Sequence, residues 1–173
     1  MRAGRGGAPV AVWRWRGDRH VLTAAAGLHA AAFDPTPETP WSASALARIA
    51  AMPGGALFLT GPVRAPVGLC LVQGIQPETD LVTLAVAPDA QGHGVARALL
   101  RQVAARLDGV HAMMIEVRES NSPARALYAR LGATPVGERP NYYRTSCGGT
   151  EKAILLRWDF DEGKQPDSKK PNG

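Results

Sequence analysis

Aromatic residues, cysteines and metal-ligand motifs are scarce in this sequence. Phe, Trp and Tyr make up 6% of the 173 residues, and the two cysteines, Cys70 and Cys147, lie far apart without a Cys-x-x-Cys motif. The four histidines are scattered and lack the spacing of metal ligands. This pattern excludes a disulfide framework and a zinc motif, so we expect free thiols in a reducing compartment and no metal.

Long apolar segments and runs of basic residues are missing too. No stretch is long enough to span a bilayer, and the basic N-terminus lacks the apolar segment of a signal peptide. We therefore expect a cytoplasmic protein without a membrane partner. The formal charge of +5 is spread out, so direct nucleic-acid binding is not expected. The excess indicates either a solvated surface or attraction to an anionic ligand such as a phosphate-bearing cofactor.

The length and composition predict one soluble domain, acting as a monomer or a weak dimer. Hydrophobic residues make up 45% and charged residues 20% of the chain, as in ordinary globular proteins. Residues 1–9 are expected to form a flexible arm and residues 10–158 the folded domain. Residues 159–173 are polar and contain Pro and Gly, which predicts a disordered tail.

The pattern of apolar residues predicts an α+β domain built on one mixed sheet. Strands are expected over 11–15, 56–60, 66–73, 80–86, 111–117, 134–138 with 141–143, and 151–158. Helices are expected over 19–33, 42–52 and 95–107, and from Ser122 to a stop at Gly132. Asp18, Ser42 and Ser122 are the N-cap candidates. A long helix between strands 80–86 and 111–117 requires a parallel crossover.

A glycine-containing turn between the strand ending at Val86 and the helix from Val95 is the most informative segment. Gly92 and Gly94 allow the backbone to approach a ligand closely. The free N–H groups of the following helix and its positive dipole end form a site suited to phosphate. Arg97 and Arg101 add positive charge. No Lys-Ser/Thr pair closes the turn and the full Gly-x-Gly-x-x-Gly pattern is absent, which excludes a Walker loop and disfavours a dinucleotide fold. A tight turn without a ligand is the alternative.

The segment Gln91-Gly92-His93-Gly94-Val95-Ala96 resembles the acetyl-CoA signature of the GNAT acetyltransferase superfamily. Further matches are Pro40-Trp41-Ser42, Ile115 to Asn121, Ala126-Leu127-Tyr128, Leu131-Gly132 and Arg139 to Tyr143. Together they are similar to the RimI-type enzymes, which acetylate the N-terminal alanine of a ribosomal protein. The resemblance covers roughly residues 11–156. It implies the GNAT fold, with about seven strands in a mixed sheet and helices on both faces.

The resemblance also implies a co-substrate, acetyl-CoA, and the residues that hold it. The backbone of Leu84, Ala85 and Val86 is expected to pair with the pantetheine arm, and the side chain of Asn121 to form a hydrogen bond with the cofactor. The pyrophosphate is expected to bind the turn formed by Gln91, Gly92, His93, Gly94, Val95, Ala96 and Arg97.

Two residues match the family's catalytic groups: Glu116 as general base and Tyr128 as general acid. On the strand, Ala112, Met114 and Glu116 share one face, and Met113, Ile115 and Val117 the other. A carboxylate beside apolar side chains is costly unless it is used or solvated. Alternatively, Glu116 faces water or pairs with Arg118, and Tyr128 is an ordinary core residue.

Asn141, Tyr142 and Tyr143 are the candidates for binding the acceptor, which the resemblance implies is a protein N-terminus, that of a ribosomal protein. An edge strand with packed aromatics is the alternative. The family usually has proline after these residues, whereas this chain has Arg144, which bears on peptide specificity. Two other functions stay open: acetylation of a small amine such as a polyamine or antibiotic, and a CoA-binding sensor without turnover.

Overall fold

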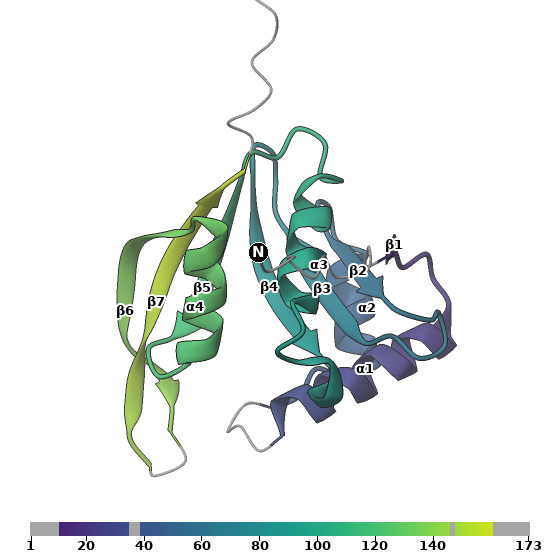
Figure 1. Cartoon of the computed structure of the whole chain (residues 1–173), viewed down its shortest axis with the longest axis horizontal. Coiled ribbons are helices and arrows are strands. Elements are labelled where there is room, and N and C mark those ends of the chain that lie inside the picture. The colour runs from purple at the N-terminus through teal and green to yellow at the C-terminus, as the bar shows by residue number, and fades with distance from the viewer. Residues whose placement is uncertain (1–10, 35–38, 146–147, 161–173) are drawn as a thin grey trace, which may run out of the picture.

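The computed structural model describes residues 11–34, 39–145 and 148–160, which form a sheet of seven strands with helices on both faces (Figure 1). This architecture confirms the predicted α+β class. The predicted arm at residues 1–9, Cys147, and residues 161–173 of the predicted tail lie outside the described residues.

The strands follow the order β1-β2-β3-β4-β5-β7-β6 across the sheet. Their bounds are β1 Val12–Arg14, β2 Ala56–Thr60, β3 Gly68–Gln73, β4 Glu78–Val86, β5 Ala112–Arg118, β6 Thr134–Arg144 and β7 Thr150–Asp159. All neighbours are antiparallel except β4 and β5, which are parallel and joined by the predicted crossover. The last strand, β7, lies between β5 and β6.

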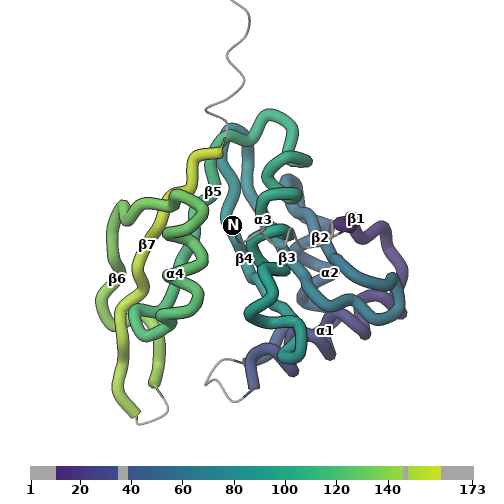
Figure 2. Tube along the Cα trace, in the orientation of Figure 1, coloured from purple at the N-terminus to yellow at the C-terminus, as the bar shows by residue number. Residues whose placement is uncertain are grey.

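The α-helices lie in two pairs on opposite faces of the sheet (Figure 2). Their bounds are α1 Arg19–Phe33, α2 Ala43–Ala50, α3 Val95–Ala104 and α4 Ser122–Leu131. The side chains of α3 and α4 pack with apolar residues of β1 to β5 and β7 in one core, which we call the first core. The side chains of α1 and α2 pack against apolar residues of β1 to β4 in the second core. The face of β5, β7 and β6 on the α1 side is therefore not covered by these helices.

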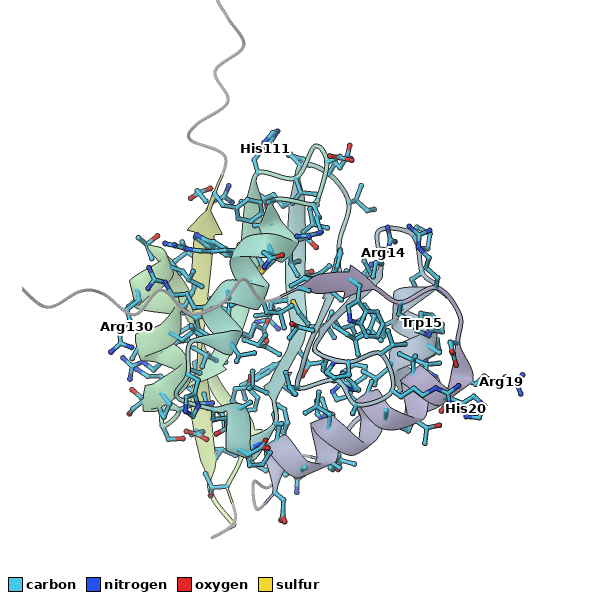
Figure 3. All side chains as sticks on the ribbon, turned by 45° about the vertical axis from the view of Figure 1, so that its right-hand side comes forward. Arg14, Trp15, Arg19, His20, His111 and Arg130 are labelled. Carbon is cyan, nitrogen blue, oxygen red and sulfur yellow. The ribbon has the colours of Figure 1, made fainter. Side chains whose placement is uncertain are left out.

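Local sequence signals explain where most helices begin and end. The carboxylate of Asp18 accepts from the backbone N–H groups of His20 and Val21, at 2.8 and 3.4 Å, and begins α1. The hydroxyl of Ser42 accepts from the N–H of Ala45 and begins α2. Both N-caps were predicted. Figure 3 shows the start of α1, marked by Arg19 and His20, at the outer rim of the molecule, and Arg130 projecting away from α4.

Several predicted boundaries need correction. The tail was expected to begin at Asp159, but this residue is the last of β7. Helix α3 ends at Ala104, not at residue 107, and is followed by turns over residues 105–109, where Gly109 has φ +70°. The N-cap of α4 is Asn121, not Ser122, since the Asn121 side chain accepts from the N–H of Ala124 at 3.1 Å. The predicted pair of strand pieces at 134–138 and 141–143 is one strand, β6, with two shifts of register.

The parallel strands β4 and β5 diverge along their length. Their pairing runs only from Glu78 opposite Ala112 to Leu81 opposite Ile115, although β4 continues to Val86 and β5 to Arg118. The divergence begins where β4 bulges: Leu81 and Thr83 oppose consecutive residues of β3, so Val82 is the extra residue. Figure 1 shows the two halves of the sheet meeting at one end and parting at the other. None of the helices in the described part of the chain has the length and apolarity to cross a membrane.

Candidate functional site

The turn between β4 and α3 has the backbone geometry expected of a phosphate site. Gly92 and Gly94 have φ +75° and +81°, a region that side chains disfavour. A Cβ added at either glycine would meet nothing within 4 Å, so the space beside the turn is open. Gly94 is the N-cap of α3 and provides no side-chain cap. The first N–H groups of α3 are therefore available for an anion at the positive end of the helix dipole.

Two side chains of the same turn hold its shape instead of pointing at a ligand. The amide of Gln91 donates to the carbonyl of Val86 at 3.0 Å. The ring Nδ1 of His93 donates to the carbonyl of Gln91 at 2.8 Å. Both side chains thus shape the backbone of the turn, whereas the side chain of Arg97 is exposed near the start of α3.

The edge of β4 that faces β5 carries unpaired backbone groups beyond the divergence. The N–H of Ala87 donates to Val67 on the β3 side at 2.9 Å. Successive amides of a strand point to opposite edges, so the N–H of Val86 points towards the β5 side. An extended ligand can therefore add to Leu84, Ala85 and Val86 as an extra strand would. The carbonyl of Val86 is already used by Gln91.

Asn121 lies at the start of α4, where its side-chain oxygen caps the helix. This hydrogen bond fixes the orientation of the carboxamide. Its NH₂ group is the part that can donate to a ligand.

Glu116 lies on the uncovered face of β5, because its neighbours Ile115 and Val117 point into the first core. Its carboxylate is about one third exposed and forms an ion pair with Arg139 of β6, with Oε1 3.0 Å from the guanidinium. The alternative pairing with Arg118 is wrong. Arg118 instead contacts Glu151 of β7 at 2.6 Å, because β7 intervenes between β5 and β6 and brings Glu151 within reach.

A second carboxylate, Asp80, lies on the same face and was missed by the sequence analysis. Asp80 is opposite Met114, two residues before Glu116. Partial burial raises the pKa of the Asp80 carboxyl, and the charges of Glu116 and Glu78 raise it further, while Arg139 acts in the opposite direction. The alternation of β4 could have shown that Asp80 faces away from the first core, but not that it neighbours Glu116.

Tyr128 lies on the opposite face of the sheet from Glu116. It is 6% exposed and belongs to the first core. Burial raises the pKa of its phenol above the ordinary value, and the charges of Cys70 and Tyr143 act in the same direction. The hydroxyl is therefore protonated at neutral pH, and burial makes it a weaker acid than an ordinary phenol.

The two catalytic candidates thus lie on opposite faces of the sheet. Within the sheet, paired strands separate the two faces, but pairing of β4 and β5 stops at Leu81 and Ile115. Glu116 is one residue beyond this last pair.

The predicted acceptor-binding residues lie in the second irregular stretch of β6. Asn141 has φ +53° and its side chain contacts the hydroxyl of Thr150 at 2.8 Å. The rings of Tyr142 and Tyr143 are perpendicular, with centroids 5.0 Å apart. The guanidinium of Arg139 lies 5.3 Å from the Tyr142 ring and that of Arg118 lies 4.3 Å from the Tyr143 ring. These contacts link the loop to Glu116 through Arg139.

A metal centre has no basis in the residues that the structure describes, since no three His, Cys, Asp or Glu side chains there are grouped to hold an ion. The donors that converge are instead backbone N–H groups, which suit an anionic ligand such as a pyrophosphate.

Comparison with known sequences gives a family. A model of the acetyltransferase (GNAT) family matches residues 28–133. The [ribosomal protein bS18]-alanine N-acetyltransferase of Haemophilus influenzae is 38% identical over 92 residues, which cover 52% of this chain and 62% of that protein. The Escherichia coli K12 protein of the same name is 41% identical over 50% of this chain and 59% of its own length. The chain thus spans about three fifths of the curated relatives it matches.

Solved structures share the fold. The ribosomal-protein-S18-alanine N-acetyltransferase from Escherichia coli superposes with a TM-score of 0.75 at 28% identity, over 90% of this chain and 98% of that one. A putative acetyltransferase from Salmonella typhimurium, solved with its cofactor acetyl-CoA, gives a TM-score of 0.69 at 17% identity, over 93% and 99%. The expected GNAT fold is confirmed.

Proposed function

Since this chain belongs to the acetyltransferase (GNAT) family, we propose that it transfers the acetyl group of acetyl-CoA to a free amine, and that this amine is a protein N-terminus. The observation that carries the proposal is the divergence of β4 and β5, with a carboxylate on one face and a protonated tyrosine on the other. Similarity to the ribosomal-protein alanine N-acetyltransferases supports an N-terminal alanine of a ribosomal protein as the acceptor.

Acetyl-CoA would supply an activated acyl group as a thioester. In our proposal its pyrophosphate binds the amides between Gly92 and Arg97, and its pantetheine arm lies along Leu84 to Val86. The open space at both glycines and the unpaired edge of β4 support this placement. Asn121 adds a hydrogen bond from its NH₂ group.

Glu116 would accept the proton of the incoming amine, directly or through a water. At neutral pH roughly a tenth of α-amines are already neutral, because their pKa is near 8. An N-terminal acceptor therefore demands little of the base. Asp80 adds negative charge on the same face, which favours the arrival of a cationic amine.

The transfer forms a C–N bond and breaks the C–S bond of the thioester. The developing charge on the carbonyl oxygen would be stabilised by the N–H of Val86, which points towards the divergence. Tyr128 would protonate the departing thiolate. Most of the acceleration would come from holding amine and thioester together, since positioning alone supplies roughly 7–11 kcal/mol.

The acceptor peptide would lie over β6 and β7, on the face that α1 and α2 leave uncovered. Tyr142 is exposed there and Asn141 is held by Thr150. Both can contact backbone of a bound peptide. Arg144, in place of the family's proline, adds a positive charge at the end of β6.

The test is transfer of acetyl from acetyl-CoA to a peptide beginning Ala-Arg, followed by release of the CoA thiol and by mass spectrometry. The same peptide with a blocked N-terminus and an internal lysine is the matched control, and free polyamines are the competing substrates. We expect acetylation of the free N-terminus alone. Preference for polyamines would contradict the N-terminal acceptor, and saturable cofactor binding without thiol release would contradict catalysis.

In cells, N-terminal proteomics with and without the gene identifies the acceptor. We expect loss of one acetylated N-terminus that begins with alanine.

A further inference from the structure

His29 of α1 is a buried titratable side chain that the proposed reaction does not use. It is 1% exposed, and its ring stacks on Phe33 at a centroid distance of 4.2 Å. Its Nε2 lies 2.9 Å from the hydroxyl of Thr83, and the N–H of Trp41 donates to its Nδ1 at 3.4 Å. One side chain thus joins α1, the segment leading into α2, and the middle of β4.

The hydrogen-bond partners define the state of the ring. A backbone N–H only donates, so Nδ1 is an acceptor and carries no proton. In a neutral ring the proton is then on Nε2, which donates to Thr83. The Thr83 hydroxyl is the acceptor.

Thr83 occupies a sensitive position of β4. It follows the bulge at Val82 and opposes Leu71 of β3, whose side chain lies in the second core with α1. It also directly precedes Leu84 to Val86, and lies beyond the last pair of β4 and β5. A bulge determines which face and which edge the following residues present. A shift of one residue would turn the N–H of Val86 towards β3.

We propose that His29 is a positioning residue for the cofactor: through Thr83 it fixes the bulged part of β4, so that the edge from Leu84 to Val86 stays open to acetyl-CoA. The inference rests on the proposed function, because it assumes that this edge binds the pantetheine arm. It also connects that edge to Trp41, in the segment that leads into α2.

The inference is tested by removing the hydrogen-bond acceptor, the hydroxyl of Thr83, without changing the shape of the side chain. Thr83→Val removes the hydrogen bond between His29 and residue 83, whereas Thr83→Ser keeps the hydroxyl. We expect Thr83→Val and His29→Phe each to raise the Kd for acetyl-CoA about five- to tenfold, the change typical of one hydrogen bond. The double variant should bind no more weakly than the weaker single one, because both remove the same bond. Thr83→Ser should bind like the wild type.

A control variant separates positioning from general stability. Val21→Ala removes buried side-chain volume from the same helix, and should lower the Tm without changing the Kd. If Thr83→Val lowers the Tm but binds acetyl-CoA like the wild type, His29 is merely structural and the inference is overturned.

Hydrogen exchange of the free protein provides a readout that needs no cofactor. Segment 82–87 should exchange faster in Thr83→Val and His29→Phe than in the wild type, Thr83→Ser or Val21→Ala. If wild-type protein fails to bind acetyl-CoA, the proposed function fails, while the exchange result still decides whether His29 fixes β4. Equal exchange in all variants would overturn the inference.

Discussion

The cofactor side and the acceptor side of the proposed site use different groups of the chain. The cofactor side consists mainly of backbone: two glycines with positive φ, the first amides of α3 and the open edge of β4. The acceptor side consists of charged and aromatic side chains that pair across strands, with Glu116 and Arg139 at its centre. Backbone sites depend on local sequence, whereas side-chain sites depend on which strands become neighbours.

The largest effect should come from breaking the cofactor side alone. Gly94→Asp places a carboxylate beside the proposed pyrophosphate and a side chain at φ +81°. We expect the affinity for acetyl-CoA to fall at least about a hundredfold, or about 2.7 kcal/mol, as measured by calorimetry.

Gly132→Asp is the matched control, because Gly132 also has a positive φ and open space but ends α4. It should change stability and not affinity. Wild-type affinity in a folded Gly94→Asp variant would refute the phosphate turn.

Breaking the acceptor side should leave cofactor binding intact. Glu116→Gln removes the proposed base, and general bases contribute about a hundredfold or more to rate. We expect kcat to fall about a hundredfold while the Kd for acetyl-CoA is unchanged. Glu138→Gln is the control: Glu138 lies on β6 and, like Glu116, forms an ion pair, with Lys152 at 2.8 Å. Equal turnover of the two variants would remove Glu116 from the mechanism.

Tyr128 lies where the two sides meet, and its loss should have a smaller effect. A CoA-like thiol has a pKa near 8.5, so its thiolate leaves without full protonation. We expect Tyr128→Phe to lower kcat about tenfold. An acetyl thioester of a more acidic thiol should be used by both proteins at nearly equal rates. A tenfold difference that persists with that substrate would argue that Tyr128 is only a packing residue.

The smallest expected effect is on the stability of the fold, and it concerns Asp80 on the acceptor side. The raised pKa of Asp80 means that the folded state holds its proton more tightly than the unfolded state. Protonated Asp80 therefore favours the folded state. This contribution to stability is fully present below the pKa of about 3.9 that Asp80 has in the unfolded chain, and it is lost as the pH rises through the pKa of Asp80 in the folded protein. Asp80→Asn should have a higher Tm than the wild type at pH 7, and the difference should vanish near pH 3. A lower Tm at pH 7 would show that Asp80 forms a net favourable ion pair.

Most of the fold could be predicted because its signals are local. Asp18 and Ser42 cap their helices, Gly132 ends α4 with φ +92°, and the apolar stripe of α3 enters the core. The position of β7 between β5 and β6 could not be predicted, because strand order depends on contacts between distant segments.

The same distinction applies to the site. The glycine turn was found from Gly92 and Gly94, whose role follows from their backbone freedom. The partner of Glu116 was not found, since Arg139 approaches it only through the order of β5, β7 and β6. Asp80 was missed for the same reason: it becomes a neighbour of Glu116 through the parallel pairing of β4 with β5.

A crystal structure with bound acetyl-CoA tests the central claim most directly. We predict that the pyrophosphate contacts the amides between Gly92 and Arg97, and that the acetyl group lies between β4 and β5 just beyond Leu81 and Ile115, with Glu116 on one side and Tyr128 on the other. An acetyl group bound on either face away from this divergence, or a pyrophosphate bound elsewhere, would contradict it.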